Sequence, residues 1–239
     1  IICFGALVIY DLGNVAKRYV NDDAFTSARN VDKPYKASAI DNEILKDKSY
    51  YRVADLTKNV MADGSTSYFH KSIGGYHAAK PRRYQELYDF QIAKGNMEVF
   101  NMLNTRYIVI ANEKGEKSVE INGSANGNVW LVNNLKVVET ANAEMKAMDS
   151  LKTKNEAVIN AKNISNGFTT NYPMDAEASI SLKSYKANEL VYESSSNLNQ
   201  FAVFSEIYYK EGWNAYVDGR LTPHYNVNYV LRGMEIPKG

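Results

Sequence analysis

The chain has 239 residues, of which 45% are hydrophobic, so it is long enough to bury a sizeable core in one or two domains. Its 28 basic and 27 acidic side chains leave a formal net charge of +1, which argues against a nucleic-acid binder, because such proteins concentrate basic residues on one face. Cys3 is the only cysteine, which excludes a disulfide framework and a cysteine-rich zinc site. The 18 tyrosines and 26 asparagines are consistent with a glycan-rich or extracytoplasmic setting.

Residues 1–10 contain no charged side chain. They are too few to cross a bilayer, since a transmembrane helix needs about 20 apolar residues. A signal-peptide core would follow Lys or Arg and precede a small-residue cleavage site, but here Asp11-Leu12 follows the run. A buried core strand is the plainer alternative. We expect instead that residues 1–12 are the remnant of a transmembrane helix.

From residue 13 to residue 153, helical and strand patterns alternate. Pro81 suits the first position of a helix, and apolar side chains then share one face from Tyr84 to Ile92. The apolar run 107–111 is typical of a strand that is buried on both faces. Further helices are expected near 15–20, 40–45, 97–103 and 143–151, and further strands at 50–56, 129–132 and 135–138. This order predicts an α/β layer domain over residues 13–153.

After about residue 154, helical periodicity disappears and short alternating runs follow one another. They occupy 178–182, 189–192, 201–208, 213–217 and 225–231. Asp218-Gly219 lies between two of these runs and is a strong hairpin signal. The pattern predicts a β-sandwich of jelly-roll or immunoglobulin-like type over residues 154–239, which we expect to be truncated at its C-terminus. The predicted fold class is therefore α+β, with an α/β domain followed by a β-sandwich.

The sequence lacks the motifs of several enzyme classes. It contains no phosphate loop, no dinucleotide-binding glycine motif and no G-x-S-x-G nucleophile elbow. The spacing of His70 and His77 matches no standard helical zinc pair, so we expect no metal site, and we expect no cofactor. Cys3 lies apart from any base that could activate a thiol. A glycosidase needs two facing carboxylates, and four candidates are conceivable without one standing out: Asp63, Asp89, Glu206 and Asp218.

Residues 67–84 carry two histidines, four cationic side chains and three tyrosines at the expected start of a helix. A helix N-terminus attracts anions, and neighbouring cations would reinforce this attraction. Tyrosines could stack on a sugar ring while a histidine binds a hydroxyl or a phosphate. The segment predicts a pocket for a phosphorylated or lipid-phosphate-linked sugar, formed by Tyr76, His77, Lys80, Arg82, Arg83 and Tyr84. The alternative is a Gly-Gly turn before an amphipathic helix whose arginines are solvated or paired with Glu86 and Asp89.

The aromatic segment 201–219 indicates a second candidate site. Exposed tyrosine and tryptophan rings pack against the C–H face of a pyranose in many carbohydrate-binding modules. Strand alternation places Trp213, Ala215 and Val217 on one side, so we expect Trp213 to be a core residue. The remaining tyrosines are the candidates for an exposed carbohydrate platform: Tyr208, Tyr209 and Tyr216.

Several blocks of the sequence, in a fixed order, carry a family resemblance. The main ones are Ser72-Ile73-Gly74-Gly75-Tyr76-His77, Asn101-Met102-Leu103-Asn104-Thr105-Arg106-Tyr107, and Ser205-Glu206-Ile207-Tyr208-Tyr209 with Gly212-Trp213. Over about residues 11–239 they resemble the extracytoplasmic region of YfhO-type bacterial integral membrane proteins, which are glycosyltransferase-C-like.

This resemblance implies a polytopic membrane protein related to lipid-sugar-dependent glycosyltransferases of the cell envelope. It places the present region on the extracytoplasmic side of the bacterial cytoplasmic membrane, between transmembrane helices outside the 239 residues. The catalytic acid of such enzymes is expected near those helices, so no residue here is expected to be catalytic. The expected partners are the membrane and a glycan or lipid-linked sugar. The alternative is a non-catalytic carbohydrate-binding or structural module of the envelope.

Overall fold

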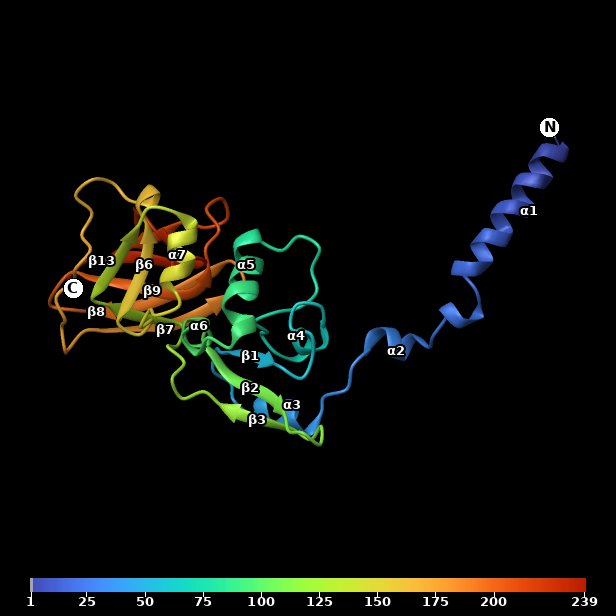
Figure 1. The fold of residues 1–239 in the computed structure, drawn as a ribbon, viewed down its shortest axis with the longest axis horizontal. Helices are drawn as coiled ribbons and strands as arrows, with labels where there is room; N and C mark the ends of the chain where they lie inside the picture. Colours follow the sequence, from blue (N-terminus) through green and yellow to red (C-terminus); the bar gives the residue numbers. More distant parts are fainter. Residues whose placement is uncertain (1) are drawn as a thin grey trace. The chain divides into compact units, whose positions relative to one another are not determined.

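The computed structural model of the chain describes residues 2–239 (Figure 1). Its contacts divide the chain after Ala39 into two units. The first unit contains α1 (Ile2–Tyr19), the short 3-10 helix η1 (Asp22–Ala24) and α2 (Ala28–Asp32), and none of their described residues is buried. Within residues 2–239, no helix combines the length and the apolarity that crossing a bilayer requires.

The second unit begins with a three-stranded sheet in the order β1-β2-β3. Its strands are β1 (Arg52–Asp55), β2 (Thr105–Ala111) and β3 (Lys117–Ile121), and α3 (Ala39–Ile44) precedes them. Strands β1 and β2 are parallel, so a crossover must connect them. Helices supply it, as the predicted alternation requires: α4 (Ser65–Phe69), α5 (Arg82–Phe90), η2 (Ile92–Lys94) and α6 (Met97–Met102).

The main sheet has six strands in the order β4-β9-β13-β12-β6-β5. They are β4 (Val129–Val132), β9 (Gln200–Ile207), β13 (Leu231–Ile236), β12 (Tyr225–Val227), β6 (Glu156–Asn160) and β5 (Asn134–Val138). Neighbours are antiparallel except β5 and β6, which α7 (Ala141–Ala147) connects. Strands β4 and β5 lie at opposite edges although only Asn133 separates them, so the sheet curls until its edges meet at this residue.

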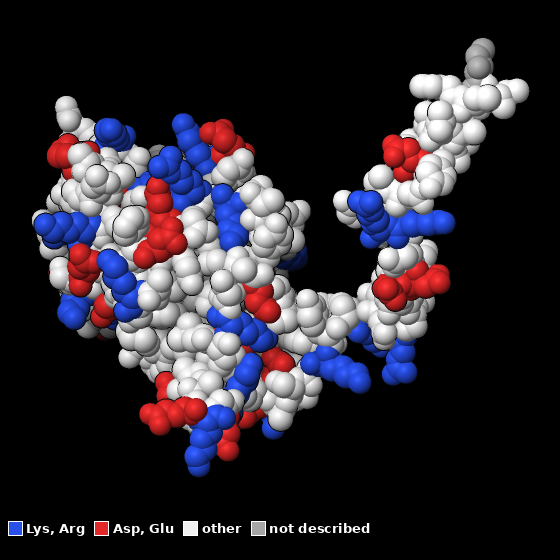
Figure 2. Space-filling view, turned by 45° about the vertical axis from the view of Figure 1, so that its right-hand side comes forward, with Lys and Arg blue, Asp and Glu red and all other residues white. Residues whose placement is uncertain are grey.

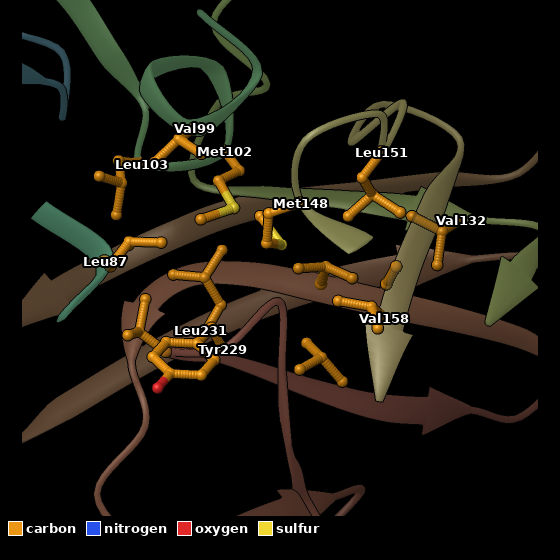
Figure 3. Packing of buried hydrophobic residues seen from close by; sticks show 14 of the residues in the cluster. Leu87, Val99, Met102, Leu103, Val132, Met148, Leu151, Val158, Tyr229 and Leu231 are labelled. Carbon is orange, nitrogen blue, oxygen red and sulfur yellow. The ribbon is translucent and has the colours of Figure 1, made fainter. Parts of the chain in front are cut away.

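Alternate residues of β9 enter two different cores, because successive strand side chains point to opposite faces of a sheet. On the inner face, Phe201 and Val203 join the larger core with residues of α5, α6 and α7. Figure 3 shows part of this core, where Met102 of α6 and Met148, just after α7, point into the cluster. On the outer face, Phe204 packs against two hairpins. These are β7 (Ser179–Lys186) with β8 (Glu189–Ser195), and β10 (Ala215–Val217) with β11 (Arg220–Thr222).

The predicted boundary between residues 153 and 154 falls inside one sheet and one core. Strands β4 and β5 lie before it, whereas their partners β9 and β6 lie after it. The larger core likewise extends from Ala54 to Leu231. The sequence pattern placed β4 and β5 with the preceding helices because short strands carry no signal for distant partners. The structure is thus a mixed helix-and-strand fold with several sheets.

Candidate functional site

A cavity of about 1240 Å³ lies on the outer face of the main sheet, and we call it the sheet cavity. Its floor consists of side chains from β9 and β13, and its walls come from the β7–β8 hairpin and from residues 212–218. Ligand pockets typically have volumes of about 300–1,000 Å³, so the sheet cavity has room for an extended ligand. The residues on which its chemistry depends are Glu206, Trp213, Tyr216, His224 and Arg232.

Arg232 extends from β13 into the sheet cavity and lies against Trp213. The guanidinium carbon is 4.3 Å from the centroid of the Trp213 ring, and Nε donates a hydrogen bond of 3.1 Å to the carbonyl of Ile207. Burial lowers the pKa of Arg232, while Glu206 opposes this shift. The two Nη nitrogens donate no hydrogen bond to any residue in the described part of the chain. The aromatic contact and the Nε bond therefore hold a guanidinium whose outer edge remains free.

Glu206 brings a carboxylate to the same cavity. Its side chain is only 15% exposed, and its closest cation is Arg52, with Nη2 3.8 Å from Oε2. Arg52 is itself held by hydrogen bonds from Nη1 to the carbonyls of Leu103 (2.7 Å) and Ser205 (2.6 Å). The Glu206 carboxylate accepts no hydrogen bond from the residues that the structure describes. A mostly buried carboxylate without hydrogen bonds is energetically costly, which makes it a strong acceptor for a ligand.

Lys71 attaches the loop before α5 to the β7–β8 hairpin. Its Nζ lies 3.3 Å from the ring centroid of Tyr185 and 4.4 Å from that of Tyr50, and the two tyrosine rings stack with their centroids 4.5 Å apart. Desolvation lowers the pKa of Lys71, Glu206 raises it and Arg52 lowers it further. Lys71, Arg52 and Glu206 therefore lie within electrostatic range of one another.

His224 lines the sheet cavity beside Tyr208, with the two ring centroids 5.4 Å apart. Burial and the nearby Arg232 lower the pKa of His224, which favours the uncharged form of the ring. Its Nε2 is buried and has no hydrogen-bond partner among the described residues. His224 thus places a buried, unpartnered ring nitrogen in the cavity wall, beneath its surface.

The residues predicted to form a sugar-phosphate pocket make contacts within the protein. The hydroxyl of Tyr84 donates to the carbonyl of Ile73 at 2.5 Å, and burial raises the pKa of Tyr84 to about 12. Arg83 pairs with Glu144 on α7 at 2.5 Å. Two further contacts complete the set: Arg82 to Glu86 at 2.8 Å, and Lys80 Nζ to the carbonyl of Met61 at 2.5 Å.

Tyr76 and His77 are exposed in the loop before α5. The Nδ1 atom of His77 accepts a hydrogen bond of 3.0 Å from the amide of Ala79. Neither residue lines the sheet cavity, and the other four predicted pocket residues do not line it either. The ion pair between Arg82 and Glu86 is the one that the amphipathic-helix interpretation expects.

The predicted tyrosine platform is divided by the structure. Tyr216 lines the sheet cavity, Tyr208 contacts it through His224, and Tyr209 is not among the lining residues. The expected alternation from Trp213 to Val217 is confirmed, because every second residue is more buried. However, the prediction that Trp213 is a core residue is wrong. It is half-buried in the cavity wall, because this side of the segment covers a cavity instead of a packed core.

Sequence reasoning missed Arg232 as a site residue. The signal was present, since this charge interrupts the apolar run from Val230 to Met234. Among residues 2–239, no three histidine, cysteine or acidic side chains are grouped so that they could hold a metal ion. The relation to YfhO-type proteins stays a prediction from the sequence, since no family model matches the chain and no curated protein or solved structure matches it either.

Proposed function

We propose that this chain recognises a carbohydrate in the sheet cavity. The observation that carries the proposal is the presence of Trp213, Arg232 and Glu206 in one cavity. Flat aromatic side chains pack against the C–H faces of sugar rings, and charged groups make the stronger hydrogen bonds. The Nη atoms of Arg232 offer donors, whereas the oxygens of Glu206 offer acceptors, which together suit neighbouring sugar hydroxyls.

We further propose that the chain is the extracytoplasmic part of a glycosyltransferase-like membrane protein of the bacterial cell envelope. The exposed apolar side chains of α1 support this, and residues 2–10 carry no charge, which is the white stretch before the first red side chain of α1 in Figure 2. Lys17 and Arg18 in the last turn suit a membrane–water interface. The ligand would be a lipid-linked sugar or an envelope polymer, and we propose no catalytic residue within this chain.

We also propose that the main sheet and the β7–β8 hairpin form the two layers of a β-sandwich, of jelly-roll or immunoglobulin-like type. Ile180 of β7 and Tyr192 of β8 pack against the outer-face core of the sheet, which supports two layers of strands. The ring centroids of Tyr192 and Phe204 are 4.8 Å apart in an edge-to-face arrangement. Such a second layer is what encloses the sheet cavity.

The test compares two tyrosines of nearly equal exposure, Tyr216 (60%) and Tyr209 (62%). Only Tyr216 lines the sheet cavity, so Tyr216→Ala should weaken binding to bacterial envelope glycans on an array by about threefold to tenfold, the range expected for one aromatic contact. Tyr209→Ala should bind as the unmodified chain does. The proposal fails if no glycan binds, which leaves a purely structural role, or if both substitutions reduce binding equally.

A further inference from the structure

Arg232 is the cation lining the sheet cavity that has no ion-pair partner among the described residues. Three cationic side chains, Arg52, Lys71 and Arg232, act on the single carboxylate of Glu206. Arg52 and Lys71 do not line the cavity, and the two lysines that do line it are paired within the β7–β8 hairpin, Lys183 with Glu193 at 2.5 Å and Lys186 with Glu189 at 2.8 Å. Asp218 also lines the cavity, but it lies exposed in the turn between β10 and β11. The residues that line the cavity carry three cationic and four anionic side chains, and Arg52 and Lys71, which lie outside the lining, bring the group to five cations against four anions.

Arg232 is the cation of this group that is free to bind a ligand. Arg52 already donates to two backbone carbonyls and is the cation closest to the Glu206 carboxylate. Lys71 lies on the faces of two tyrosine rings. By contrast, Arg232 has its plane fixed by Trp213 and its Nε fixed by Ile207, while both Nη atoms are unused. A guanidinium held in this way suits two parallel hydrogen bonds to a carboxylate or phosphate.

We infer that the sheet cavity binds an acidic saccharide, with the sugar's carboxylate or phosphate on the Nη atoms of Arg232. Trp213 would contact the face of a sugar ring, and Glu206 would accept hydrogen bonds from the hydroxyls of the sugar. The inference rests on the proposed carbohydrate recognition and adds the charge of the ligand to it. Arg52 is the cation closest to Glu206, so an anion would supply the partner that the Arg232 guanidinium lacks, whereas a neutral sugar would leave this charge unpaired in a partly desolvated cavity.

The test uses two pairs of probes that differ in charge, with binding to the whole chain measured by calorimetry. The first pair is a hexuronic acid oligosaccharide and its carboxyl-reduced form, and the second is a hexose phosphate and the free hexose. We expect at least one acidic probe to bind about tenfold more tightly than its neutral partner, which identifies the anion as carboxylate or phosphate. This preference should decrease as salt is raised to about 0.5 M.

Arg232→Gln should reduce the preference to about twofold or less and leave the weaker binding of the neutral probe in place. Arg232→Lys should give an intermediate preference, because it keeps the charge but loses the two-nitrogen edge. Lys183→Gln combined with Glu193→Gln is the matched control: it removes a whole cavity-lining ion pair without changing the net charge, so the preference should remain.

Each outcome separates the inference from the proposed function. Equal binding of acidic and neutral probes, or an equal loss of the preference in the Lys183→Gln, Glu193→Gln double variant, overturns the inference but leaves carbohydrate recognition intact. Binding of no saccharide overturns both. If Arg232→Gln does not fold, the charge preference of the unmodified chain and its salt dependence still decide the question.

Discussion

Gly74 lies directly against the backbone of Val60. A Cβ atom on Gly74 would lie 2.0 Å from the carbonyl oxygen of Val60 and 2.5 Å from its Cγ1. The amide of Gly75 donates to the same carbonyl at 2.7 Å, which fixes the two segments close together. Gly74 therefore permits a close approach to the Val60 backbone that any larger residue would prevent.

Gly74→Ala should destabilise the protein by about 2 kcal/mol or more, because the clash involves backbone atoms that cannot move aside cheaply. The free energy of unfolding from denaturant titration measures this effect. Gly123→Ala is the control: no heavy atom lies within 4 Å of its added Cβ, so the change should stay within about 0.5 kcal/mol. Similar unfolding midpoints for the two variants would show that the approach of Gly74 to Val60 does not constrain the fold.

Single residues also show how far the sequence predicts the site. The alternation around Trp213 predicted which side chains of that segment share a side, because this depends only on local strand geometry. The pairing of Trp213 with Arg232 could not be predicted in the same way. It depends on the register between β13 and β9, which is shifted by an irregularity between Leu231 and Arg232. A shift of one residue reverses the face on which a side chain lies.

At the scale of elements, α5 is attached to α7 by an ion pair. Glu144 of α7 is fully buried and accepts hydrogen bonds from Arg83 at 2.5 Å and from the amide of Tyr229 at 3.0 Å. The Arg83 guanidinium lies 4.1 Å from the ring centroid of Tyr229, and the Tyr229 hydroxyl donates to Glu86 at 2.6 Å. Arg83 thus connects two helices and the turn before β13, which explains why it is not available to a ligand.

Burial raises the pKa of Glu144 above its usual 4.5, although Arg83 and the Tyr229 amide act in the opposite direction. The folded state therefore holds this proton to a higher pH than the unfolded state does. The stabilising effect of the proton is complete below about pH 4.5 and is lost as pH rises through the raised pKa. Removing Arg83 should raise the pKa of Glu144 further and so increase the stability that is lost as pH rises.

Arg83→Ala should therefore cost about 3 kcal/mol at about pH 8, because it leaves a buried charge without its cation, and clearly less at about pH 5. Denaturant unfolding at the two pH values measures this difference. In Arg83→Ala combined with Glu144→Gln, the additional pH dependence should disappear, because the buried group no longer ionises. A loss for Arg83→Ala that is the same at both pH values would contradict the role given to the Glu144 charge.

A helix or strand was predicted correctly where its own residues carry a clear apolar periodicity, and it was missed where they do not. Helix α5 was predicted because its apolar side chains recur with helical spacing over the whole element. Strand β3 was missed because four of its five residues are exposed, so it has no apolar alternation. Strand β6 was missed for a different reason: its buried core Ala157-Val158-Ile159 is short and is surrounded by polar residues that favour turns.

At the scale of the whole molecule, residues 40–239 should unfold as one cooperative unit. The main sheet joins strands from both sides of residue 153, and the larger core includes side chains from both parts. Scanning calorimetry should give a calorimetric enthalpy equal to the van't Hoff enthalpy for this unit. Two separate transitions, or stable halves released by proteolysis near residue 153, would instead support the two-domain division that the sequence predicted. Sequence patterns cannot decide this point because they do not show which distant strands pair.

The position of Asn133 has a consequence for how the protein is made. Strand β5 meets β6 soon after synthesis, through the short crossover that contains α7. Strand β4, directly before Asn133, has to wait for β9, because Val132 pairs with Phe201. While the chain is still emerging from the ribosome, the apolar segment Val129–Val132 therefore remains without its partner. An unpaired strand of this composition is prone to aggregate, so chaperone demand during translation should be concentrated on this segment.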